Sequence, residues 1–133
     1  MRHSIPFSVP LAAAFLVAMA LILGPTVADA QSTRSLNRSV KAGQEVEFQW
    51  LNFNDRTCKD NGYPSLIVER KPSLGRFRTV KRQFTQRSGP CKGRKFSVLL
   101  VYYVAGRNKG TDRTAFVIDG QNRLRIMLNM QVE

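Results

Sequence analysis

Apolar and polar residues alternate with a period of two over most of the chain beyond residue 40, and no convincing helical period of 3.6 residues interrupts them. The clearest case is residues 45–53, where Val46, Phe48 and Trp50 alternate with charged or polar residues. Successive side chains of a strand point to opposite faces of a sheet, so this pattern predicts a strand with one buried face. The alternation therefore predicts an all-β domain.

Further strands are predicted over 65–70, 76–84, 96–104, 114–118 and 124–131, with turn residues between them. Residues 96–104 (FSVLLVYYV) are apolar on both parities, which is typical of a central strand buried on both faces. Asp119 and Gly120 predict a tight hairpin turn before the last strand. About seven short strands predict an antiparallel β-sandwich, with a small β-barrel as the structural alternative.

Residues 1–30 differ sharply from the rest, because they contain 20 of the 57 apolar residues. An apolar run over 11–23 follows Arg2 and His3, and it precedes Gly24 and the small-residue triplet 28–30. This order is typical of a signal peptide, and cleavage is predicted after Ala30. A 13-residue helix spans about 20 Å, which is short of the roughly 30 Å of a bilayer core. An uncleaved membrane anchor is the alternative.

The predicted domain organisation is a cleaved signal peptide over 1–30, a flexible polar lead-in over 31–39 and a folded domain over 40–133. No second apolar run of comparable length follows residue 30. We therefore expect a periplasmic or secreted protein that is peripheral to membranes rather than integral.

Cys58 and Cys91 both lie in the part predicted to be exported. Two cysteines in an oxidising compartment usually form one disulfide, and free or intermolecular thiols are the alternative. The one histidine, His3, lies in the leader, so no histidine is available for a catalytic triad or a metal site. We expect no catalytic residue, no metal and no cofactor, and hence a protein that is not an enzyme.

The chain has 21 Lys and Arg against 9 Asp and Glu, a formal charge of +12. Ten of the cations lie within residues 70–95, which contain no carboxylate, and they form the predicted anion-binding set: Arg70, Lys71, Arg76, Arg78, Lys81, Arg82, Arg87, Lys92, Arg94 and Lys95. Such a concentration attracts polyanions, for example an anionic component of a bacterial envelope. A merely solvated basic surface, or protection of an edge strand, is the alternative.

On the predicted strand 76–84, Arg76, Arg78 and Arg82 share one parity and are expected on one face. Proteins that bind single-stranded nucleic acid place exposed aromatic side chains in a basic groove. Here the aromatic residues, Phe77 and Phe84 among them, are instead expected in the core.

Tyr102, Gly110, Thr111, Asp112 and Phe116 form a pattern that resembles the closing motif of bacterial Ig-like and cadherin-like β-sandwich domains. The resemblance to small exported bacterial proteins of this kind extends upstream over Cys58, Gly62, Pro64, Val68, Pro72, Gly75 and Cys91. It implies an Ig-like sandwich in which the two cysteines pair, and it implies no shared catalytic residues.

The sequence thus predicts an exported, non-enzymatic Ig-like domain with a basic face for anionic partners, acting in binding or in envelope architecture. The alternative is a secreted inhibitor or effector whose cysteine-anchored loops recognise a target.

Overall fold

The computed structural model describes residues 31–133, and all regular secondary structure in this range is β. The strands are β1 (Ser32–Val40), β2 (Glu45–Leu51), β3 (Phe53–Asn54), β4 (Lys59–Asp60), β5 (Ser65–Arg70), β6 (Gly75–Thr85), β7 (Lys95–Ala105), β8 (Gly110–Asp119) and β9 (Leu124–Val132). The described residues contain no helix long and apolar enough to cross a membrane. The predicted all-β class is confirmed.

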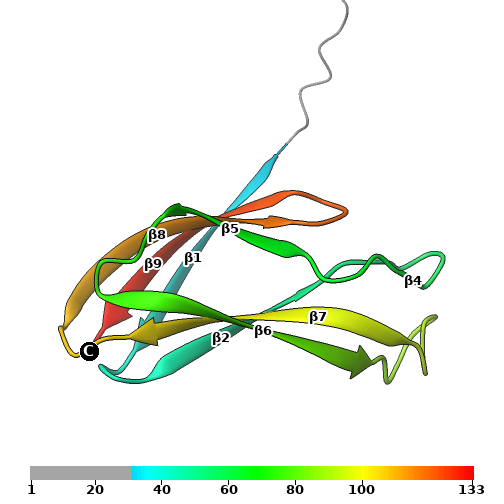
Figure 1. Cartoon of the computed structure of the whole chain (residues 1–133), viewed down its shortest axis with the longest axis horizontal. Helices are drawn as coiled ribbons and strands as arrows, with labels where there is room; N and C mark the ends of the chain where they lie inside the picture. Colours follow the sequence, from blue (N-terminus) through cyan, green and yellow to red (C-terminus); the bar gives the residue numbers. More distant parts are fainter. Residues whose placement is uncertain (1–30) are drawn as a thin grey trace, which may run out of the picture.

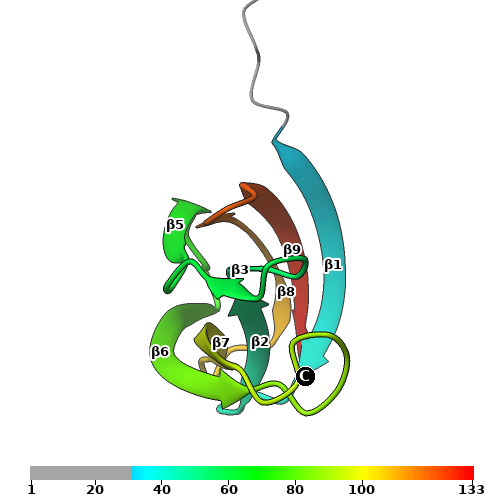
Figure 2. The ribbon, with the colours of Figure 1, turned by 90° about the vertical axis from the view of Figure 1, so that its right-hand side faces the viewer.

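Two sheets face each other across the core (Figures 1 and 2). One sheet has the order β1-β9-β8-β5 and the other the order β2-β7-β6, while β3 and β4 form a short separate ladder. The pairing of β1 with β9 is parallel, and every other pairing is antiparallel. The predicted β-sandwich therefore has nine strands rather than about seven, because β1, β3 and β4 add to the expected set.

The flexible lead-in predicted over 31–39 is wrong, because strand β1 occupies this segment. β1 pairs with β9 from Ser32 to Val40, and the Asn129 side chain donates a hydrogen bond to Asn37 at 2.9 Å. The segment has no apolar alternation because it is an edge strand, and only Leu36 and Val40 reach the core. Backbone pairing with β9 is therefore the main contact that orders it. The folded domain thus includes the segment from Ser32 onward, and the predicted signal peptide lies outside the described residues.

The core lies between the odd-numbered side chains of β7 and the inner faces of β8 and β9. Val101 and Tyr103 of β7 and Phe116, Ile126 and Leu128 opposite them are fully buried. The even-numbered residues of β7 are also buried, in a separate cluster on the other side of the sheet. The expected burial of this strand on both faces is confirmed.

The expectation that the aromatic residues near the cations lie in the core is only partly met. Phe77 packs edge-on against Phe116, with ring centroids 5.2 Å apart. Phe84 and Tyr63 are instead exposed, at 39% and 37%. Phe77 and Phe84 are seven residues apart on one strand, so they point to opposite faces of the sheet.

The buried carboxylate of Asp112, at the start of β8, joins the two sheets. It accepts hydrogen bonds from the backbone N–H groups of Ser73 at 3.0 Å and Leu74 at 2.9 Å, and from the Tyr103 hydroxyl at 2.7 Å. Ser73 and Leu74 lie on the connection by which the chain crosses from β5 in one sheet to β6 in the other. Gly110 adopts a φ of 143° two residues earlier, a conformation that glycine tolerates readily.

These hydrogen bonds outweigh the cost of burying the charge. Burial raises the pKa of Asp112, but the donors on Ser73, Tyr103 and Leu74 together bring that pKa below its ordinary value. Burial, and next the hydrogen bond to Asp112, raise the pKa of Tyr103, so its hydroxyl stays a donor through the neutral range. A lowered native pKa favours folding above the ordinary aspartate pKa, and this stabilisation is lost as the pH falls through the lowered value.

Replacing Asp112 with Asn should lower the free energy of unfolding by about 2–4 kcal/mol at pH 7, because the amide removes the charge and leaves a buried donor unpaired. Urea unfolding measures the change, and Asp119→Asn at the exposed end of the same strand is the matched control, expected within about 0.5 kcal/mol of the parent. The Asp112→Asn difference should shrink below about pH 4. Equal stability of the two variants at neutral pH would contradict this role.

Candidate anion-binding site

The outer face of the three-stranded sheet carries the arginines that were predicted to share a parity. In the register of β6 with β7, Arg76 lies opposite Val104, Arg78 opposite Tyr102 and Arg82 opposite Val98. Val98 and Tyr102 belong to the cluster on the outer side of β7. The three arginines therefore project from one face, as the alternation predicts.

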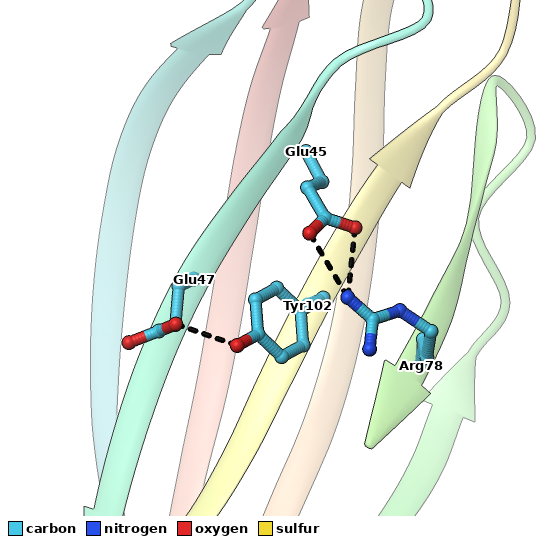
Figure 3. A network of polar contacts seen from close by, with 4 residues as sticks. All are labelled: Glu45, Glu47, Arg78 and Tyr102. Atoms are coloured by element: carbon cyan, nitrogen blue, oxygen red, sulfur yellow. Dashed lines mark hydrogen bonds and ion pairs between the residues drawn. The ribbon is translucent and has the colours of Figure 1, made fainter. Parts of the chain in front are cut away.

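Residues 70–95 contain no carboxylate, but the folded sheet places carboxylates from another strand on the same face. Glu45 and Glu47 on β2 lie across β7 from the arginines (Figure 3). Arg78 Nη2 lies 2.9 Å from both carboxylate oxygens of Glu45, and its guanidinium carbon is 4.0 Å from the centroid of the Tyr102 ring. The Tyr102 hydroxyl donates to Glu47 at 2.6 Å.

The hydrogen bonds of this network shift the proton affinities of its members. The bond from Tyr102, followed by one from Gln49, lowers the pKa of Glu47, and the same contact raises the pKa of Tyr102. Hydrogen bonding to Glu45 raises the pKa of Arg78. All three groups are therefore held in their neutral-pH forms, and Arg78 is already paired with a carboxylate rather than free for an external anion.

The other predicted cations on or beside β6 do not form one patch with these arginines. Lys81 has the opposite parity, and its ammonium lies 5.3 Å from the centroid of the Tyr63 ring. Arg70 and Lys71 lie at the end of β5 and in the connection that follows. β6 is 11 residues long, so its two ends are about 30 Å apart. The ten cations thus divide between the two ends and the middle of one long strand.

A disulfide between Cys58 and Cys91 connects two loops at one end of the molecule, to the right in Figure 1. The Cα atoms of the pair are 5.4 Å apart, and 33 residues separate the cysteines in sequence. The predicted disulfide is confirmed, and it favours an oxidising compartment. Asp60 strengthens the junction, because it accepts hydrogen bonds from the backbone and hydroxyl of Ser97 at 3.1 and 2.8 Å.

The disulfide brings the cations of both loops together. We name this set the basic tip, and its six exposed members are Arg56, Lys59, Arg87, Lys92, Arg94 and Lys95. Two carboxylates lie in the same loops, Asp55 and Asp60, and Asp60 is bonded to Ser97. The ion pairs found within residues 31–133 are Arg78–Glu45 and Arg125–Glu69, so no cation of the basic tip is paired.

Sequence reasoning missed Arg56 and Lys59, because they lie outside the run over 70–95. The signal that could have found them is their closeness to Cys58: Arg56 lies two residues before it and Lys59 one residue after it. A cysteine expected to pair brings its neighbours beside the neighbours of its partner. Pairing with Cys91 therefore adds both cations to the predicted set.

A second group of cations lies at the opposite end, where three connections meet. The backbone N–H of Gly43 donates to the carbonyl of Gly106, and the N–H of Gly106 donates to the carbonyl of Leu74. These two bonds join the connections 41–44, 71–74 and 106–109. The exposed cations of this end include Lys41, Arg70, Lys71, Arg76, Arg107 and Lys109. Glu45 and Glu133 lie among them, and no covalent bond joins these connections. A disulfide joins the loops of the basic tip, whereas backbone hydrogen bonds join the connections at this opposite end.

No protein-family model and no curated protein sequence matches this chain. A solved structure described as "Solution Structure of Amebosin" is similar in part, with a TM-score of 0.44 and 11% sequence identity over 77% of this chain and 98% of that chain. The function proposed below therefore rests on the residues of this chain. Within residues 31–133, no group of three His, Cys, Asp or Glu side chains could hold a metal ion.

Replacing both cysteines with serine should lower the free energy of unfolding by about 3–4 kcal/mol, because the bond closes a long loop in the unfolded chain. Urea unfolding of the oxidised protein and of the Cys58→Ser/Cys91→Ser variant measures the change. The variant should also show faster amide hydrogen exchange in 55–60 and 86–94 than the parent. Exchange that stays equal in these loops would show that the disulfide does not order the tip.

Proposed function

We propose that this chain is an exported, non-enzymatic Ig-like domain whose basic tip binds polyanions of the cell envelope. The observation that carries the proposal is the disulfide-held set of six exposed cations without an ion pair. A surface of this kind attracts phosphate, sulfate or carboxylate groups with little demand on their exact spacing. Binding of this type is strong at low salt and weak at high salt.

The strand order supports the Ig-like assignment. In Ig constant-type domains the second, fourth and fifth strands share one sheet, and the third, sixth and seventh share the other. With the β3–β4 ladder treated as an insertion, β2, β6 and β7 take the places of the first set and β5, β8 and β9 those of the second. The first strand, β1, lies beside β9 instead of β2. The bond from Tyr103 to Asp112 also ties the end of β7 to β8.

Export is supported by two independent features of the chain. The leader over 1–30 has the order of a signal peptide, and the disulfide suits an oxidising compartment. A periplasmic or secreted protein meets phosphates, acidic glycans and anionic lipids of the envelope. Lack of a histidine beyond His3 and the cationic character of the tip support a binding role rather than a catalytic one.

The disulfide-held loops also favour a second candidate function, a secreted inhibitor or effector. Covalently joined loops lose little conformational entropy when they bind a target protein. In that case the loops over 55–58 and 86–94 would recognise one protein with defined side-chain contacts. Inhibition of a secreted protease or nuclease that persists at about 0.5 M salt, where exposed charges are screened, would favour this candidate.

The proposal is tested by removing three charges from each end of the molecule. Lys59→Gln/Lys92→Gln/Arg94→Gln changes the basic tip, and Lys41→Gln/Arg76→Gln/Arg107→Gln lowers the net charge equally at the opposite end. We expect the tip variant to leave a heparin column at about half the salt concentration needed by the parent, because fewer counterions are released. The opposite-end variant should shift by less than a quarter as much.

Equal shifts for the two triple variants would contradict the proposal, because they would show that total charge matters and location does not. Circular dichroism and urea unfolding of both variants should match those of the parent, since all six side chains are exposed. Parent protein that does not bind heparin at low salt would also refute the proposal.

A further inference from the structure

A hollow opens on the outer face of the three-stranded sheet, in the half of the face nearer the basic tip, and it is lined by apolar side chains together with Glu47, Gln49, Arg82 and Gln83. Val98 and Leu100 of β7 form its floor and are 6% and 5% exposed. Leu51 of β2 and Phe84 of β6 form its walls and are 41% and 39% exposed. The hollow has a volume of about 250 Å³. The described part of the chain provides no second layer over it.

Charged side chains are distributed unevenly along this face. The register places Glu45 and Glu47 with Arg76 and Arg78 in the half away from the tip. In the tip-proximal half the register aligns Leu51, Val98 and Arg82, and Arg82 is the charged side chain there. Glu47 reaches the far rim of the hollow, where its carboxylate already accepts from Tyr102 and Gln49.

The half of this face that holds the hollow continues into the basic tip. β6 runs from the hollow into the loop that carries Arg87 and Lys92, and β7 returns from that loop through Arg94 and Lys95. Figure 1 shows β6 and β7 running side by side toward this end. At the start of β7, Phe53 stacks on the fully buried Phe96, with ring centroids 4.4 Å apart. The exposed apolar side chains Leu51 and Phe84 and the cations of the tip therefore lie toward the same end of this sheet.

We infer that this surface docks onto an anionic phospholipid bilayer, with Leu51 and Phe84 inserted among the headgroups and Arg82 and the basic tip on lipid phosphates. A free polyanion would leave the two exposed apolar side chains without a partner. A bilayer interface takes up apolar and aromatic side chains and attracts cations at the same surface. The inference rests on the proposed function, because it names the anionic partner of the same tip.

The test is co-sedimentation of the oxidised protein with sonicated vesicles of two compositions. We expect binding to vesicles of 30% phosphatidylglycerol in phosphatidylcholine and none to pure phosphatidylcholine. Leu51→Ser should weaken binding about fivefold, and Leu51→Ser/Phe84→Ser about twentyfold or more, through loss of buried apolar area. Ile67→Ser is the matched control, because Ile67 is 40% exposed on the other sheet; it should bind like the parent.

Heparin retention of the same variants separates the two proposals. Leu51→Ser/Phe84→Ser should keep parental retention, since no charge is removed. Parent protein that binds heparin but ignores anionic vesicles overturns the bilayer inference and leaves the proposed function standing. Vesicle binding unchanged in the double variant also overturns it, as does self-association of the parent that the double variant abolishes. Parent protein that binds neither heparin nor anionic vesicles refutes both proposals.

Discussion

The carboxylate of Asp112 accepts hydrogen bonds from the β5–β6 connection and from Tyr103 of β7, and the closure of the sandwich depends on these contacts. A buried charge is tolerated only where such donors surround it. At the other end of the molecule the Cys58–Cys91 bond joins the loop between β3 and β4 to the loop between β6 and β7. The two sheets share a modest core, and one junction at each end fixes the connections between them. The ends are consequently the places where exposed side chains are held in defined positions.

Strand β7 contributes both to the core and to the outer face of its sheet. Its odd-numbered residues, such as Val101, form the core, and its even-numbered residues, such as Leu100, form the floor of the outer hollow. This floor is nearly buried, and the exposed apolar side chains beside it are Leu51 and Phe84. The charges lie around this face in a specific order, with the paired group Glu45–Arg78 at one end and the unpaired basic tip at the other.

The all-apolar run over 96–104 predicts β7, which is buried on both faces, whereas period-two alternation predicts strands such as β2 and β9, which have one face in the core. Alternation could not reveal β1, which is ordered by backbone pairing with β9 and has almost no apolar pattern. Phe84 was expected in the core with the other aromatic residues. Its parity on β6 instead places it on the outer face, with Arg82. Register between distant strands decides the rest: Glu45 neutralises Arg78 although 33 positions separate them, and Arg56 joins the tip only through the disulfide.

We propose that the two disulfide-joined loops act as one anion-binding surface. The most direct test is a titration of ¹⁵N-labelled oxidised protein with a heparin hexasaccharide, followed by amide chemical shifts. We expect residues 56–59 and 87–95 to shift together with one dissociation constant, and the shifts to vanish at about 0.5 M salt. Shifts centred on 41–44, 71–74 and 106–109, or spread evenly over the described surface, would contradict it.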